Sequence, residues 1–235
     1  IFGLYKVFPK ISWLNMYYAQ HLTENQSGKV DILVGAFMIM KRDLYLEVGG
    51  FDENCFMYSD DIDLSYMVLK SGKENYYFHE TSVIHYKGES TFRDDLYMKR
   101  FREAMQFFYK KHFKKAFIFD MMMQTGTIVF SFIKKNQQKN RKAEIEEYVV
   151  FTKAKLHLNL NKKSTYLSDL DFFINDKNKL IELVFDTNTF SFIEIISFME
   201  RTKANNITFK NYIGNSNYLI GSNYSDERGE IILIN

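Results

Sequence analysis

Apolar residues in the first third of the chain fall into short runs separated by polar and glycine-containing segments. The run over residues 30–40 (VDILVGAFMIM) is rich in β-formers and is interrupted by Gly35, which predicts a buried strand whose backbone closely approaches another group. Residues 41–48 predict a short helix that stops at Gly49 and Gly50, because glycine reaches positive φ at low steric cost. Further along, the pattern predicts a helix over residues 61–71 and strands over residues 75–78 and 82–86.

The middle of the chain is more strongly amphipathic. Residues 94–112 alternate charged and apolar side chains at helical spacing, which predicts a long helix that closes the first domain. Residues 116–133 form the most apolar stretch, but Asp120 and Gln124 interrupt it and its length is marginal for crossing a bilayer, so no transmembrane helix is predicted. Lysines on both flanks suit a helix on an anionic membrane surface, and an ordinary buried helix with basic ends fits equally well.

The last third of the chain predicts a second, smaller α/β domain. No G-x-G-x-x-G turn follows its first strand, so the sequence gives no support for dinucleotide binding. The predicted organisation is a first domain over residues 1–112, a helix and polar linker over 113–143, and the small α/β domain over 144–235. The elements predicted for this domain are strands over residues 148–152, 180–185, 206–209 and 231–233 and a helix over 191–204.

Composition narrows the classes of protein that fit. Hydrophobic residues make up 46% and charged residues 26% of the chain, which is typical of globular proteins. The 31 basic and 29 acidic residues give a net charge of +2, so no global field would recruit nucleic acid. Cys55 is the single cysteine, which rules out an internal disulfide and fits a reducing cytosol. Because the chain opens with Ile1 and no initiator methionine, we expect it to be a segment of a longer protein.

Three carboxylates in the segment GGFDENCFMYSDDIDLS are the first candidates for chemistry. Asp60, Asp61 and Asp63 follow an apolar strand and enter a predicted helix, where acids at the end of a strand can face a cleft. Aspartates at a helix N-terminus also cap free N–H groups and interact favourably with the helix dipole, so a structural role carries similar weight. His85 in SVIHYKGEST ends a predicted strand, and a lone strand histidine is more often structural than a ligand.

Three motifs in a fixed order resemble a known family. They are VDILVGAFMIMKR, GGFDENCFMYSDDIDL and VIHYKGES, spread over about sixty residues. They resemble the second half of bacterial family 2 glycosyltransferases of the rhamnosyltransferase-like type. The resemblance implies a GT-A fold, in which a nucleotide-sugar half with a D-x-D metal motif precedes the acceptor-side half. The chain would then carry the acceptor-side half alone, and we expect it to be inactive and to bind nucleotide sugars poorly by itself.

The resemblance implies a role for each candidate residue. Asp61 matches the second acid of a Glu-Asp pair and would be the general base that takes the proton from the acceptor hydroxyl while that oxygen attacks and inverts the anomeric carbon. Asp60 stands where the family has Glu, which keeps the charge but leaves its positioning role open. His85 matches the histidine that completes the coordination of Mg²⁺ or Mn²⁺ on the diphosphate. The implied acceptor wall is Gly35, Ala36 and Phe37, with Trp13, Tyr17 and Tyr18 as stacking platforms or core residues.

The expected enzyme is a hexosyltransferase that moves a sugar from a nucleotide-sugar donor to a glycan or lipid-linked acceptor in surface-polysaccharide synthesis, in the cytoplasm or at the inner face of the membrane. Asp63 is expected to cap or brace its helix. The last part of the chain resembles, more weakly, a Rossmann-like domain of membrane sugar-phosphate transferases, without a catalytic role. Two alternatives stay open. One is a non-catalytic binding or scaffolding module, and the other, with less support, is a glycoside hydrolase with paired carboxylates.

Overall fold

The computed structural model describes residues 19, 21–55, 57–86, 95–113, 121, 144–223 and 229–234. The chain groups into two compact units, one of residues 1–81 and 93–136 and the other of residues 82–92 and 137–235. The predicted first domain, residues 1–112, includes residues 82–92. In the structure these residues group with the second unit. The predicted helix and linker over residues 113–143 lie outside the described residues, apart from Phe113 and Met121.

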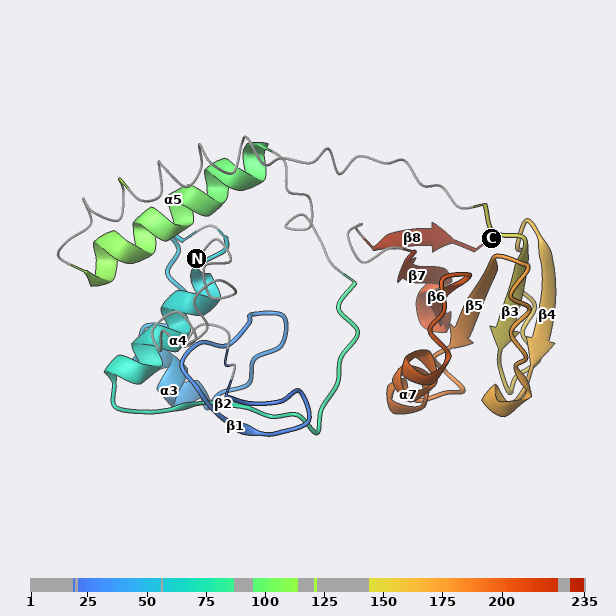
Figure 1. The fold of residues 1–235 in the computed structure, drawn as a ribbon, viewed down its shortest axis with the longest axis horizontal. Helices are drawn as coiled ribbons and strands as arrows, with labels where there is room; N and C mark the ends of the chain where they lie inside the picture. The colour runs from blue at the N-terminus through green and yellow to red at the C-terminus, as the bar shows by residue number, and fades with distance from the viewer. Residues whose placement is uncertain are drawn as a thin grey trace. The chain divides into compact units, whose positions relative to one another are not determined.

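The first unit contains a small antiparallel sheet and three described helices (Figure 1). In the sheet, Gly28 lies opposite Tyr77 and Val30 opposite Asn75. Val48, which follows the helix over residues 42–47, forms a small core with Leu64 and Val68 of the helix over residues 60–70. Met38 and Met40 pack against this core. The elements in chain order are β1 (Gly28–Val30), α3 (Arg42–Glu47), α4 (Asp60–Lys70), β2 (Asn75–Tyr77) and α5 (Asp95–His112).

Local sequence explains where these two helices begin and end. After α3, Gly49 and Gly50 take positive φ values of 88° and 63°, and the N–H of Gly50 donates to the carbonyl of Tyr45. Helix α4 carries three aspartates in its first turn and Lys70 in its last, which is the charge order that the helix dipole favours. Gly72, with φ of 78°, then ends α4. The helices predicted over residues 41–48 and 61–71 are therefore confirmed.

Two predicted strands of the first part of the chain are not formed. Only Val30 of the run 30–40 lies in a strand, and residues 31–40 are irregular, with Ile39 82% exposed. The prediction of a buried strand was wrong because, among the residues described, no neighbouring strand pairs with this segment. Residues 82–86 are also irregular, because they lie on the second unit and pair with no strand.

The second unit is a six-stranded mixed sheet with one long helix. Figure 1 shows its strands side by side in the order β4-β3-β5-β6-β7-β8, the first four parallel and the last two pairings antiparallel. The predicted strands near residues 148, 180, 206 and 231 and the helix near 191 are confirmed, whereas β4 and β7 were not predicted. The elements are β3 (Glu147–Phe151), β4 (Lys163–Leu167), η3 (Leu170–Phe172), β5 (Ile181–Asp186), α7 (Phe192–Thr202), β6 (Ile207–Ile213), η4 (Gly214–Ser216), β7 (Tyr218–Ser222) and β8 (Glu230–Leu233).

Both faces of this sheet are covered. Along β3, Val149 and Phe151 belong to one apolar cluster and Tyr148 and Val150 to another, as the alternation of side chains along a strand requires. Helix α7 covers the first cluster with Ile195 and Phe198, and residues 156–160 cover the second. All six residues of β5 are buried, which is typical of a central strand in a parallel sheet. The predicted α/β class is confirmed.

A segment from the first part of the chain completes the second unit. Ile84 packs against the cluster beneath α7, and Nδ2 of the buried Asn211 donates to the hydroxyl of Tyr86 at 2.7 Å. The backbone of Tyr86 lies so close to Gly229 that a Cβ at this glycine would come within 2.6 Å of the Tyr86 carbonyl oxygen. The described helices include none that is long and apolar enough to cross a membrane.

Candidate active site

Asp61 lies in the first turn of α4, and its carboxylate is fixed at both oxygens. Oδ2 accepts a hydrogen bond from the backbone N–H of Gly35 at 2.8 Å, and Oδ1 accepts one from the N–H of Ile62 at 2.8 Å. Burial raises the pKa of this carboxyl above its usual value, against the opposing effect of the two N–H groups, and the neighbouring charge of Asp60 adds to the rise. The structure thus holds a half-buried carboxylate in one orientation.

Gly35 permits this contact because it has no side chain. A Cβ at residue 35 would lie 3.1 Å from Cβ of Asp61, which is tighter than most real Cβ contacts, and 3.5 Å from Oδ2 of the same residue. The family resemblance implied that a small residue here lets a sugar approach the backbone, and this role stays a prediction. In the structure the carboxylate of Asp61 approaches the backbone of Gly35. Ala36 and Phe37, the other two residues of the predicted acceptor wall, are exposed in the same loop.

The loop that carries Gly35 is anchored to α4 and β2 by polar side chains. The N–H of Leu33 donates to Oγ of Ser65 at 3.1 Å, and Nδ2 of Asn75 donates to the carbonyls of Asp31 and Ser65 at 2.8 and 3.0 Å. Ser65 and Asn75 are both buried. Sequence reasoning missed these two residues, although Ser65 follows Asp61 by four positions and so lies on the same face of α4.

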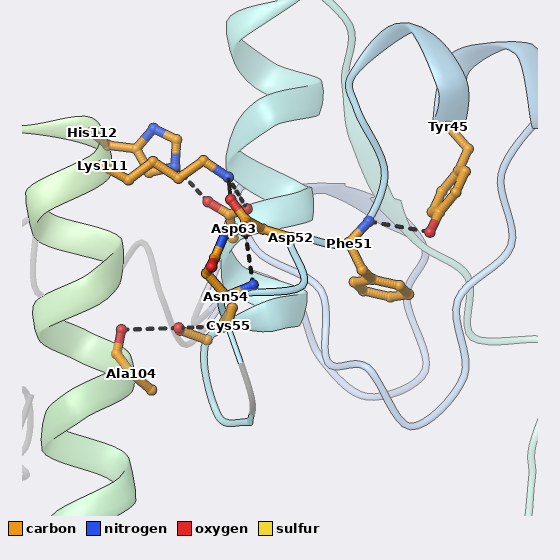
Figure 2. Close-up of polar contacts among 10 residues, drawn as sticks. Tyr45, Phe51, Asp52, Asn54, Cys55, Asp63, Ala104, Lys111 and His112 are labelled. Atoms are coloured by element: carbon orange, nitrogen blue, oxygen red, sulfur yellow. Dashed lines mark hydrogen bonds and ion pairs between the residues drawn. The ribbon is translucent and has the colours of Figure 1, made fainter.

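Asp60 and Asp63 lie in the same turn of the helix and have different surroundings. The side chain of Asp60 is half-buried and forms no hydrogen bond or ion pair with another described residue. Asp63 is 1% exposed and accepts from Nζ of Lys111 at 2.8 Å and from Nε2 of His112 at 2.5 Å (Figure 2). Asp63 therefore braces α4 against α5, which is one of the two roles expected for it, a cap or a brace of its helix. Its surroundings differ from those of Asp61.

Asp52 shares Lys111 with Asp63. Its Oδ2 lies 2.7 Å from Nζ of Lys111, and its Oδ1 accepts from the backbone N–H and the side-chain amide of Asn54 (Figure 2). These partners, Lys111 first, lower the pKa of Asp52 from 3.8 to about 2. The acidic segment before α4 is thereby tied to the end of α5.

His85 and Asp61 belong to different compact units. His85 is exposed and lies in residues 82–92, which belong to the second unit, while Asp61 belongs to the first. Among the residues whose placement is described, no three His, Cys, Asp or Glu side chains are arranged to hold a metal ion. The described residues therefore do not form a metal centre by themselves, and the role of His85 stays a prediction. Trp13, Tyr17 and Tyr18 lie outside the described residues.

Comparison with known proteins finds the same enzyme from two bacterial strains. The chain is 36% identical over 87 residues to N-acetylglucosaminyl-diphospho-decaprenol L-rhamnosyltransferase of Mycobacterium tuberculosis, in strains CDC 1551 / Oshkosh and ATCC 25618 / H37Rv. The match covers 37% of this chain and 28% of the relative's length. No protein-family model and no solved structure matches the chain. Over this part of its length, the chain is similar to a glycosyltransferase.

Proposed function

We propose that this chain is the acceptor-side part of an inverting glycosyltransferase of family 2 type with a GT-A catalytic domain. The observation that carries the proposal is the carboxylate of Asp61, held by the N–H of Gly35 in a loop next to exposed residues. The similarity to a rhamnosyltransferase supports the same reaction class. Because the chain spans only 28% of the relatives it matches, the activity is proposed for a longer protein that contains it.

Asp61 would act as the general base. A carboxylate with a raised pKa has more affinity for a proton than an ordinary aspartate, yet it is still ionised when its pKa lies below the working pH. The hydrogen bond from Gly35 occupies Oδ2 and holds the group in place, so its remaining lone pairs can accept the proton of an acceptor hydroxyl. As that proton leaves, the hydroxyl oxygen attacks the anomeric carbon from the face opposite the nucleotide, and the bond to the diphosphate breaks.

The substrates follow from the same proposal. The name of the relative describes an L-rhamnosyl transfer that involves a decaprenol-linked diphosphate sugar. For this chain we propose a nucleotide-sugar donor and a glycan or lipid-linked acceptor in surface-polysaccharide synthesis, at the cytoplasmic face of the membrane. The exposed residues Ala36 and Phe37 would line the acceptor path beside Asp61.

Dependence on Mg²⁺ or Mn²⁺ is part of the proposal, but the described residues do not form the metal site. His85 would be one ligand, and the remaining acids would come from the donor-binding half, outside these 235 residues. The part assigned to Asp61 is the proton transfer from the acceptor hydroxyl to its carboxylate.

The test is Asp61→Asn in the longer protein, measured as sugar transfer and as donor binding. Asparagine keeps the shape of the side chain but cannot take the proton, so we expect transfer to fall roughly 10²- to 10⁴-fold while donor affinity stays within about twofold. The matched control is Asp60→Asn, which alters the adjacent carboxylate without removing the proposed base. Transfer by Asp61→Asn at the wild-type rate would refute the assignment.

The same experiment separates the enzyme from the alternative of a non-catalytic binding or scaffolding module. A module of that kind would show no donor-dependent transfer in the wild-type protein, and Asp61→Asn would then change nothing measurable. The glycoside hydrolase alternative predicts hydrolysis of a glycan without a nucleotide-sugar donor. The same assay run without the donor would detect this hydrolysis.

A further inference from the structure

A cavity of the second unit has no role in the proposed reaction. It lies beside β4, the edge strand of the six-stranded sheet (Figure 1), and its volume is about 410 Å³, within the range of small-molecule sites. Ser164 and Tyr166 of β4, Lys162 before that strand and residues 157–160 line it. The cavity is therefore formed inside a single unit, by a loop and the strand that follows it.

The connection from β3 to β4 explains why space is left there. A crossover between parallel strands usually carries a helix, which covers the sheet. Residues 152–162 contain no helix. The sheet is covered instead by three leucines two positions apart, Leu156, Leu158 and Leu160. His157 and Asn159 alternate with these leucines and are exposed. Because an irregular segment is thinner than a helix, a cavity remains beside β4.

Two tyrosines hold this segment in place. The N–H of Leu158 donates to the hydroxyl of Tyr166 at 3.0 Å, and the hydroxyl of Tyr148 donates to Oδ1 of Asn161 at 3.3 Å. The ring of His157 stacks on that of Tyr166, with 5.7 Å between the ring centroids and 15° between the planes. The walls of the cavity are therefore fixed by internal contacts, which lowers the entropic cost of binding a ligand.

The polar groups around the cavity favour a phosphate. The residues that the structure describes as its lining include neither a carboxylate nor an arginine. Nζ of Lys162 carries three N–H groups and gives one to Glu144 at 2.9 Å, which leaves two for a ligand. The side chains of His157 and Asn159 form no hydrogen bond with another described residue. Lysine binds phosphate as a point charge, whereas a planar carboxylate favours the fork of arginine, so a phosphate suits this cavity better.

We propose that this cavity binds a small phosphate ester that carries a ring, either a sugar phosphate or a nucleotide. Lys162 and the amide of Asn159 donate to the phosphate, and the ring of the ligand stacks on the face of His157 that is turned away from Tyr166. Doubly wound sheets bind nucleotides in a crevice at the carboxyl ends of their strands. The proposed site lies elsewhere, because Lys162 precedes the amino end of β4.

Calorimetric titration of the 235-residue chain tests the proposal. The ligands are glucose 6-phosphate and uridine monophosphate, with glucose and inorganic phosphate as controls for the ring and the phosphate taken alone. We expect at least one ester to bind with a dissociation constant on the order of 1 mM or below, and both controls to bind roughly tenfold more weakly or beyond. The ester that binds more tightly tells a sugar phosphate from a nucleotide.

Three variants locate the site. Lys162→Met removes the charge and should weaken binding of the ester roughly tenfold or more. His157→Ala removes the stacking ring and should weaken it roughly fivefold. The matched control is Lys163→Met, at the next residue and on the other face of β4, which should stay within about twofold of wild type. Its ion pair with Glu147 corresponds to that of Lys162 with Glu144. All three side chains are exposed, so each variant should melt as the wild type does.

The proposed site is refuted if neither ester binds saturably, or if inorganic phosphate binds as tightly as both esters. It is also refuted if Lys162→Met binds the ester with wild-type affinity. Equal weakening by Lys162→Met and Lys163→Met would overturn it too, because the ester would then sense only the local positive charge. Sugar transfer plays no part in these measurements, so their result is independent of the role proposed for Asp61.

Discussion

The contact between Asp63 and the end of α5 should be the most sensitive polar interaction in the first unit. Asp63 is 1% exposed, and both of its oxygens are taken, by Nζ of Lys111 and by Nε2 of His112, whose side chain is also 1% exposed (Figure 2). Nδ1 of His112 already has no partner among the described residues. Asp63→Ala would leave the whole imidazole buried without a hydrogen bond, while Lys111 would keep Asp52.

Removing one partner of a buried charged pair costs about 3–5 kcal/mol, because the other partner stays desolvated. We expect the lower half of this range for Asp63→Ala, since Lys111 keeps one carboxylate. Amide hydrogen exchange of α4 and α5 measures the effect, and the amides of β3 and β5 in the second unit serve as the internal control. A loss of 3 kcal/mol speeds exchange from the first unit roughly 150-fold.

The matched control is Asp60→Ala. Asp60 lies three residues before Asp63 in the same helix, and its side chain has no partner among the described residues, so this variant should change exchange little. A loss below about 1 kcal/mol for Asp63→Ala would refute the reasoning, because an exposed ion pair contributes that much.

Two other variants probe the site and the sheet. Gly35→Ala would place a Cβ 3.1 Å from Cβ of Asp61 and shift the carboxylate, so we expect kcat of the longer protein to fall roughly tenfold with its melting temperature unchanged, and an unchanged kcat would contradict the close-approach argument. Lys210→Met would remove the cation that lies 3.6 Å from the buried Glu182. Burial already raises the pKa of Glu182 above its usual 4.5, and loss of Lys210 would raise it further. The folded state then binds more protons than the unfolded state, so the free energy of unfolding should fall as pH rises above about 4.5, relative to wild type, and denaturant titrations at pH 4.5 and 7.5 measure the difference. If Lys210→Met lowers the free energy of unfolding by the same amount at both pH values, the pKa of Glu182 does not depend on Lys210.

Elements whose reasons are local were predicted from the sequence. The apolar pattern over residues 61–71 predicted α4, and glycines predicted the ends of α3 and α4. In the second unit, Ser191 and Glu194 form a capping box at the start of α7, where the sequence predicted a helix from residue 191. Strand β5 was predicted because a fully buried parallel strand is a continuous apolar run, as residues 181–185 nearly are. Strand β4 was missed because its residues, KSTYL, are half polar and lie at the edge of the sheet.

The candidate base was chosen from the sequence through the family motif, but the partners that hold it were not. The N–H of Gly35 reaches Asp61 across 26 residues, and Asn75 joins the loop and the helix from a third segment, so no local pattern announces either contact. The role of His85 was inferred from the same motif, and the structure places this residue with the second unit.

The sequence by itself determined the α/β class, the helices with clear caps and the buried strands of the second unit, because each depends on side chains within a few positions of one another. Tertiary structure alone decided three further features. Residues 31–40 are not a strand because no described strand pairs with them, residues 82–86 lie on the second unit through Ile84 and Tyr86, and Asp63 is a brace because Lys111 and His112 reach it from about 48 residues away. A strand needs a neighbour and a buried charge needs a partner, and both are supplied by segments that are distant in the chain.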